Sequence, residues 1–324
     1  MKISANEDSN IPCLASHCLG PLHQLEEALL AFQSVTENWL REQWRKTPAP
    51  FYSSVDLRNA GFKLAPVDTN LFPAGFNNLN DRFISLAVQA AQETLERLLP
   101  GCLRILLIPE NHTRNSFYFE NLSTLQDILE KAGFEVRIGS LLEEMPHAKE
   151  IVLASGARVT LEPIVRVAEQ IKVKDFLPCC ILLNNDLANG IPEILQGIEQ
   201  TILPNMNLGW HSRLKSNHFR HYAQVAGEFA QLLGLDPWLI TPLFSRCAEV
   251  DFMQREGEAC MMQESQQILH ATQKKYDQYH IKEKPYVVIK ADAGSYGMGV
   301  LSIHEPDEIQ QLNRKKRRRD AGPR

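Results

Sequence analysis

The stretch from residue 284 to 303 constrains the fold of this chain more than any other, because it predicts two strands joined by a glycine-rich turn. Its first half ends in Tyr-Val-Val-Ile-Lys and its second half begins Val-Leu-Ser-Ile, and both are rich in β-branched or aromatic residues. Between them, Gly-Ser-Tyr-Gly-Met-Gly at 294–299 lets backbone N–H groups approach a ligand where no Cβ intervenes. Such a loop suits phosphate oxygens.

The residues that flank this loop separate the known kinds of phosphate-binding loop. A Walker loop ends in Gly-Lys-Ser/Thr, and both it and a dinucleotide loop open a helix, which this stretch does not. A protein kinase loop lies between strands, but its lysine follows on a later strand, whereas Lys290 ends the strand before the glycines. Lysine first and hairpin second is the arrangement of an ATP-grasp ligase. The alternative is an ordinary glycine-rich hairpin, although such a turn has no need of the charged Lys290 and Asp292.

Composition limits the classes of protein to which the chain can belong. With 324 residues, 44% hydrophobic and 23% charged, it has the composition of a soluble protein of two or three domains. A net charge of -5 argues against a nucleic-acid partner. The sequence has no apolar run long enough for a membrane span, and its acidic, polar N-terminus is unlike a signal peptide. We therefore expect a cytoplasmic protein with no membrane partner.

Neither the cysteines nor the histidines predict a metal site. The 7 cysteines are odd in number and show neither zinc spacing nor a disulfide framework, so we expect them to be reduced and mostly buried. His211, His218 and His221 lie near the start of a helix predicted from about Ser212 to Gly234. Two histidines one helical turn apart without a nearby carboxylate make a weak zinc site. A lysine in this region, Lys215, is the better candidate for contact with a nucleotide.

A polar segment from residue 51 to 82 follows a predicted core helix at 21–46 and concentrates charges and amides among aromatic and turn residues. Polar groups held in a loop by apolar neighbours suggest a binding site. The acids would meet the ammonium group of an amino acid, and Arg58 would grip its carboxylate in bidentate fashion. The alternative is a set of solvated loop residues and caps, as Asn77 and Asn78 before a helix would be. The candidate substrate-binding residues are Asp56, Arg58, Lys63, Asp68, Asn70 and Asn77.

The middle of the chain alternates strands and helices. Apolar runs predict strands at 103–108, 134–138 and 179–183, a small hairpin at 151–154 and 160–163, and helices at 81–99 and 122–132, the latter ended by Gly133. This alternation predicts a parallel sheet with helices on both faces. The turn from Asn184 to Gly190 would then lie at the carboxyl edge of the sheet, where open α/β sheets bind ligands, although turns rich in asparagine usually serve only as turns.

Three motifs together resemble the bacterial glutamate-cysteine ligase family that is distinct from the enterobacterial and plant types: FYSSVDLRNAGFKLAPVDTNLFPAGFNNLN, RLKSNHFRHY and YVVIKADAGSYGMGV. The likeness runs from about Leu25 to Arg317. It implies formation of γ-glutamylcysteine from L-glutamate, L-cysteine and ATP with Mg²⁺, the first step of glutathione synthesis. It also implies an α/β fold: a helical N-terminal segment, a Rossmann-like pre-ATP-grasp domain and the beginning of an ATP-grasp domain, divided at 1–100, 101–210 and 211–324.

The implied mechanism is phosphorylation of the glutamate γ-carboxylate and attack of the cysteine amine on the acyl phosphate. The protein would position and neutralise two anions, with Lys290 and Arg58 as catalytic residues. Another carboxylate-amine ligase, or a non-catalytic nucleotide- or amino-acid-binding fragment, remains as an alternative. The candidate ATP-binding residues are Lys215, Lys290, Asp292, Gly294, Ser295, Tyr296, Gly297 and Gly299.

The chain departs from the family pattern after the hairpin. An ATP-grasp fold needs further strands there, carrying the groups that hold Mg²⁺. The sequence instead continues with a predicted helical turn at Pro306 and the basic segment NRKKRRRDAGPR, which we read as a solvated helix end rather than a nucleic-acid patch. We therefore expect a shortened chain whose hairpin is mobile and exposes Val287, Ile289 and Leu301 unless another domain shields them.

The first testable prediction is that this chain alone forms γ-glutamylcysteine too slowly to be useful, because a lysine and a few N–H groups cannot neutralise a triphosphate. The measurement compares product formation by this chain and by a version extended through further strands, at equal concentration with ATP and Mg²⁺. Comparable turnover by the two would contradict it.

Overall fold

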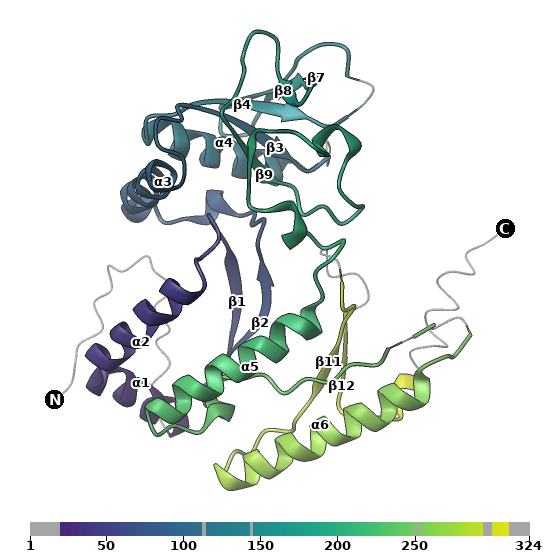
Figure 1. The fold of residues 1–324 in the computed structure, drawn as a ribbon. Helices are drawn as coiled ribbons and strands as arrows, with labels where there is room; N and C mark the ends of the chain where they lie inside the picture. Colours follow the sequence, from purple (N-terminus) through teal and green to yellow (C-terminus); the bar gives the residue numbers. More distant parts are fainter. Residues whose placement is uncertain are drawn as a thin grey trace. The chain divides into compact units, whose positions relative to one another are not determined.

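The computed structural model describes residues 20–111, 115–142, 145–248, 250–251, 254–293 and 300–310, and these form two compact units (Figure 1). Unit 1 contains Lys46–Val55 and Thr69–Ser212, and unit 2 contains His17–Arg45, Asp56–Asp68 and Arg213–Arg324, in their described parts. Each unit is thus assembled from separated stretches of chain. The three-part division expected from the sequence follows chain order and stays a prediction.

Unit 1 is built on a six-stranded sheet in the order β10-β9-β3-β4-β6-β5. Its neighbours pair in parallel except β5 and β6, which form the predicted antiparallel hairpin. The predicted α/β class and the mainly parallel sheet are therefore confirmed. The strands are β3 (Arg104–Pro109), β4 (Glu135–Ser140), β5 (Lys149–Val152), β6 (Arg158–Pro163), β9 (Cys180–Asn184) and β10 (Thr201–Leu203).

The two faces of the sheet are covered differently. Ile105 and Leu107 of β3 pack with residues of α3 (Ile84–Leu98) and α4 (Ser116–Lys131). Leu106 and Ile108, which point the other way because strand side chains alternate, pack with residues of the segment from 164 to 208. Within the described residues that segment contains β7 (Val165–Val167), β8 (Gln170–Lys172) and the 3₁₀ turns η3 (Glu193–Leu195) and η4 (Met206–Leu208), and no α-helix.

The expectation of helices on both faces is therefore wrong. On the second face, the chain between β6 and β9 forms a short hairpin and irregular segments. Apolar side chains of these segments pack on the sheet where a helix was expected. The helix boundaries also differ from the sequence pattern. Helix α4 starts six residues before the predicted position because the Asn115 side chain accepts hydrogen bonds from the N–H groups of Phe117 and Tyr118. Gly133, with φ of 97°, follows its end as predicted.

The polar segment 51–82 contains regular structure rather than only loop. Strands β1 (Ser54–Asn59) and β2 (Leu64–Asn70) form a two-stranded sheet, followed by the 3₁₀ turns η1 (Phe76–Asn78) and η2 (Asp81–Phe83). The turn between the strands is closed by Gly61, whose φ is 81° and whose N–H donates to the Asn59 side chain at 2.8 Å. The boundary between the units falls within both strands.

A network of buried polar groups lies at the carboxyl edge of the sheet in unit 1. Tyr118 donates to the backbone carbonyl of Asn184 at 2.7 Å, and Asn184 donates to the carbonyl of Pro73 at 2.7 Å. The Asn121 side chain accepts from the N–H groups of Gly75 and Phe76 at 2.8 and 3.0 Å. These bonds fasten the segment after β2 to the sheet, so the predicted ligand-binding turn that begins at Asn184 has a structural role here.

Unit 2 contains helices α1 (Pro21–Ala31), α2 (Gln33–Lys46), α5 (Lys215–Leu232) and α6 (Glu258–Gln278), and the 3₁₀ turn η5 (Pro237–Leu239). The single core helix expected at 21–46 is wrong on two counts. Phe32 separates two helices, and α2 buries none of its residues. Only Leu22 and Leu25 of α1 are buried, whereas Leu29, on the same helical face, is 36% exposed.

The predicted hairpin is present as the antiparallel pair β11 (Val287–Ile289) and β12 (Leu301–Ile303), and the glycine-rich residues between them lie outside the described residues. Val287 and Ile303 are buried in a cluster with Met261 and Leu269 of α6 and with Ile309. The expected exposure of the hairpin's apolar residues is therefore wrong for Val287, while Ile289 and Leu301 are half-buried. The reason is that α6, which the sequence pattern did not predict, supplies an apolar face within the same unit.

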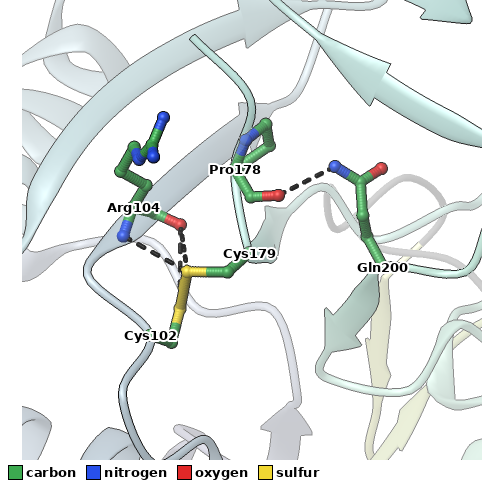
Figure 2. The surroundings of a disulfide bond; sticks show 5 residues. All are labelled: Cys102, Arg104, Pro178, Cys179 and Gln200. Atoms are coloured by element: carbon green, nitrogen blue, oxygen red, sulfur yellow. Dashed lines mark hydrogen bonds between the residues drawn. A yellow bond between two sulfur atoms is a disulfide. The ribbon is translucent and has the colours of Figure 1, made fainter.

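Two disulfides correct the expectation of reduced, mostly buried cysteines. Cys102 and Cys179 join the starts of β3 and β9 across 77 residues, and Cys247 and Cys260 join a loop to α6. Figure 2 shows the first bond beside Arg104, whose N–H lies 3.3 Å from the Cys179 sulfur, and Gln200, which donates to Pro178 at 2.9 Å. Among the cysteines that the structure describes, Cys180 alone is a free thiol, and burial raises its pKa to about 12.

No helix in the described part of the chain is long and apolar enough to cross a membrane.

The second prediction concerns Glu110, which follows β3 and accepts a hydrogen bond from the Asp186 N–H at 2.5 Å. Burial, together with repulsion from the Asp186 carboxylate, raises the pKa of Glu110 to about 7, although the N–H bond opposes the rise. The folded state then holds a proton that the unfolded state releases, so the free energy of unfolding falls as pH rises from about 4.5 to about 7, by at most about 3 kcal/mol.

Denaturant unfolding at pH 5 and pH 8 measures this effect. Glu110→Gln should flatten the difference between the two pH values, whereas the matched change Glu93→Gln, at an exposed position of α3, should leave it unchanged. An equal pH dependence in wild type and Glu110→Gln would contradict the prediction.

Candidate functional site

Two lysines from distant parts of unit 2 converge on the carboxylate of Asp68. The Lys215 ammonium lies 3.0 and 3.3 Å from the two carboxylate oxygens. The Lys290 ammonium lies 3.9 Å from one of the same oxygens and donates to the carbonyl of Val67. The Lys215 side chain is only 11% exposed, whereas the Asp68 side chain is 35% exposed, so the ammonium is shielded and the carboxylate is reached by solvent. Asp68 belongs to β2, Lys215 begins α5 and Lys290 follows β11, so three elements meet at one point.

Asp292 ties the end of β11 to the first turn of α5. Its backbone carbonyl accepts from the Lys215 N–H at 2.8 Å, and its carboxylate accepts from the N–H and the hydroxyl of Ser216 at 2.7 and 2.8 Å. Leu214, which precedes the helix, offers no side-chain cap, so Asp292 supplies the cap from another segment. Arg246 pairs with the same carboxylate at 2.8 Å. Asp292 therefore links the backbone next to Lys290 to the helix start that carries Lys215, and we call it the tether.

Burial is the largest influence on the pKa values of Lys290 and Arg213. Burial lowers the pKa of Lys290, and Lys215 lowers it further, while Asp68 and Asp56 oppose the change. Burial also lowers the pKa of Arg213, again opposed by Asp68. His218, one turn along α5 from Lys215, has its pKa lowered by burial first and by Arg213 next. This histidine is therefore held neutral near physiological pH.

This arrangement can bind an anion. Lys215, Lys290 and Arg213 bring three cationic groups around the carboxylate of Asp68, with Asp56 close enough to act on Lys290. The oxygens of a phosphate or carboxylate are the natural ligands of ammonium groups in such a shielded position. We therefore define the phosphate-site candidate as Asp68, Lys215 and Lys290, with Asp292 as its tether.

Comparison with known proteins assigns the chain to a family. A family model described as GshA: Glutamate-cysteine ligase matches residues 26–322. The chain belongs to the glutamate-cysteine ligase family. The family resemblance and the ligase activity predicted from the three sequence motifs are confirmed at this level.

The ligase is similar to a crystal structure of a protein from Methylobacillus flagellatus KT that carries the name gamma-glutamylcysteine synthetase. The match covers 93% of the ligase chain. The two share 49% sequence identity and superpose with a TM-score of 0.87, and the match covers 71% of the relative's chain. No curated protein sequence matches this ligase. The sequence-based expectation of a shortened chain stays a prediction.

The predicted substrate-binding residues of the ligase are divided between the two units. Asp56 and Arg58 are exposed on β1 and, two residues apart in a strand, lie on the same face. Asn70 accepts from the Phe72 N–H at 2.9 Å in a local turn, and Asn77 is exposed in η1, both in unit 1. Their predicted roles in substrate binding stay predictions.

Lys63 has a different environment from the other predicted residues. Its ammonium donates to the carbonyl of Thr241 at 2.7 Å and lies 4.4 Å from the centre of the Trp238 ring. Phe62 next to it packs with Trp238 and Tyr276, so Lys63 forms part of an aromatic cluster. Burial lowers the pKa of Lys63 to about 8, while Asp236 opposes the change. These contacts support a structural role rather than the predicted contact with substrate.

Three of the predicted nucleotide-binding residues lie within the described part of the chain, and these three lie close together. Lys215, Lys290 and Asp292 meet as above, whereas Gly294, Ser295, Tyr296, Gly297 and Gly299 lie outside the described residues. Asp292 caps α5 and pairs with Arg246 in the structure, and its expected contact with ATP stays a prediction. Ser216 and Arg246 were missed. Ser216 follows Lys215 in the RLKSNHFRHY motif, but no pattern in the sequence marks Arg246.

The described residues contain no group of three or more His, Cys, Asp or Glu side chains that could hold a metal ion. His218 packs between the rings of Phe219 and Tyr222 instead.

Proposed function

We propose that Lys215 and Lys290 bind the phosphates of ATP in the ligation of L-glutamate to L-cysteine. The observation that carries this proposal is their convergence on Asp68 from α5 and from the end of β11. In the proposed reaction the glutamate γ-carboxylate attacks the terminal phosphorus of ATP, which forms an acyl phosphate and releases ADP. The cysteine amine then attacks the acyl carbon, the amide bond forms, and phosphate leaves.

The chain's own contribution is positioning and charge neutralisation. Phosphoryl transfer needs its attacking and leaving oxygens held in line and the negative charge of the phosphates offset, with little covalent work from the protein. Lys215 is shielded from water, which strengthens each of its ionic contacts relative to an exposed lysine. In this proposal the Asp68 carboxylate holds both ammonium groups in position until ATP binds.

The amino-acid side of the site is proposed on Asp56 and Arg58. A guanidinium binds a carboxylate through two parallel hydrogen bonds, and a carboxylate two residues away on the same strand face can accept from the substrate ammonium. Both side chains are exposed, as ligand contact requires. Asn70 and Asn77 are retained as secondary candidates.

Mg²⁺ is proposed to arrive bound to the ATP phosphates, where it would offset further negative charge. The described residues do not fit a metal site of their own, because they lack a cluster of metal-binding side chains. No step of the proposed mechanism therefore passes through a metal held by these residues.

The order of lysine and hairpin supports an ATP-grasp arrangement for unit 2, since Lys290 follows β11 directly and the glycine-rich stretch leads to β12. The parallel sheet of unit 1 is proposed as the Rossmann-like domain that precedes it. The division into 1–100, 101–210 and 211–324 is kept as part of this proposal.

The third prediction tests the phosphate side. Lys290→Ala should weaken binding of a non-hydrolysable ATP analogue by about 10- to 100-fold, because a charge-assisted contact contributes roughly 1.5 to 3 kcal/mol. Isothermal titration calorimetry with Mg²⁺ present measures it. Lys284→Ala, an exposed lysine just before the hairpin, is the matched control and should bind as wild type does. Unchanged affinity in Lys290→Ala would remove this lysine from the site.

The fourth prediction tests the amino-acid side. Arg58→Lys should weaken L-glutamate binding about tenfold and spare the ATP analogue, because lysine cannot reproduce the bidentate contact. Titration of each ligand separately gives the two affinities, and the exposed Arg45→Lys serves as control. Equal loss for both ligands, or a lower melting temperature with no change in affinity, would favour a structural role for Arg58.

A further inference from the structure

Arg246 occupies a defined position in unit 2 that neither its sequence context nor the family resemblance explains. Its guanidinium Nε lies 2.8 Å from Asp292 Oδ2, and its side chain is 45% exposed. The same oxygen accepts from the Ser216 hydroxyl at 2.8 Å, and the other carboxylate oxygen accepts from the Ser216 N–H at 2.7 Å. Arg246 therefore contacts the group that caps α5.

The neighbours of Arg246 fix the segment on which it lies. Ser245 donates to the carboxylate of Glu264, and Cys247 is bonded to Cys260. Glu264 and Cys260 both belong to α6. Residues on either side of Arg246 are thus attached to the same helix, while Arg246 itself reaches Asp292. The backbone that carries Arg246 is therefore attached on both sides, and its guanidinium pairs with Asp292.

The ion pair between Arg246 and Asp292 also offsets the negative charge of the Asp292 carboxylate. A carboxylate beside a site for a triphosphate would repel the ligand and compete for its lysines. Here the Asp292 carboxylate is offset by the Arg246 charge and by the N–H groups at the start of α5. The lysines can then act on Asp68 or on an incoming anion.

We infer that Arg246 is a positioning residue for ATP binding, which acts through Asp292 to fix the first turn of α5 and so the ammonium of Lys215. Its guanidinium orients the carboxylate, the carboxylate caps the helix, and the capped turn directs Lys215 at Asp68. Lys290, two residues before Asp292, benefits from the same fixation. This inference rests on the proposed function, since it assigns Lys215 to the phosphates.

The experiment measures binding of adenylyl imidodiphosphate with Mg²⁺ by the full chain. Arg246→Ala should lose about tenfold in affinity, a coupling of ordinary size for residues in one network, while L-glutamate binds as in wild type. Arg246→Lys keeps the positive charge that offsets the Asp292 carboxylate and should recover affinity to within about threefold of wild type. Arg255→Ala is the matched control, because Arg255 forms a comparable pair with Glu258 at 3.0 Å and is 50% exposed, and it should have no effect.

A double-mutant cycle separates positioning from general stability. In a Lys215→Met background, which keeps the length of the side chain, the effect of Arg246→Ala should shrink from about tenfold to less than about threefold. A tenfold loss in both backgrounds, unchanged affinity in Arg246→Ala, or equal loss of ATP-analogue and glutamate binding would each overturn the inference and leave the proposed function standing. Failure of the wild-type chain to bind the analogue would overturn both.

Discussion

The arrangement of charged groups in unit 2 depends on the pairing of Lys215 with Asp68. Burying an ammonium without an acid beside it costs free energy, and removing one partner of such a pair costs far more than the pair contributes. The carboxylate that pairs with Lys215 also lies 3.9 Å from the Lys290 ammonium. One acid on β2 therefore holds together cations that come from two other elements.

Asp292 shows how a second acid can lie close to these cations without competing for them. Its oxygens are occupied by the N–H and hydroxyl of Ser216 and by the Arg246 guanidinium. A carboxylate that caps a helix start is stabilised by the helix dipole as well as by hydrogen bonds. The cap is formed between segments 76 residues apart, so the start of α5 depends on the end of β11. Local helix propensity alone would not place Lys215.

The buried polar network at the carboxyl edge of the sheet in unit 1 is stabilised by neutral hydrogen bonds rather than by ion pairs. Tyr118, Asn121 and Asn184 satisfy one another and the backbone of the segment after β2 with neutral hydrogen bonds. Where two acids meet, at Glu110 and Asp186, burial favours a proton on Glu110 rather than a cationic partner. Neutral groups suit a network that holds the sheet edge together, whereas the charged group of unit 2 suits an anionic ligand.

The sequence by itself determined the features that depend on neighbours along the chain. Continuous apolar runs predicted β3 and β9, Gly133 marked the end of α4, and the pattern before the glycine-rich stretch placed Lys290 at the end of a strand. Tertiary structure decided whatever depends on which distant segments meet. The partner of Cys102 lies 77 residues away, Lys63 lies against Trp238 rather than with the other polar residues of its segment, and Arg246 reaches Asp292. Periodicity and turn chemistry act over a few residues, whereas the energies of these contacts arise only when burial removes water from groups brought together by the fold.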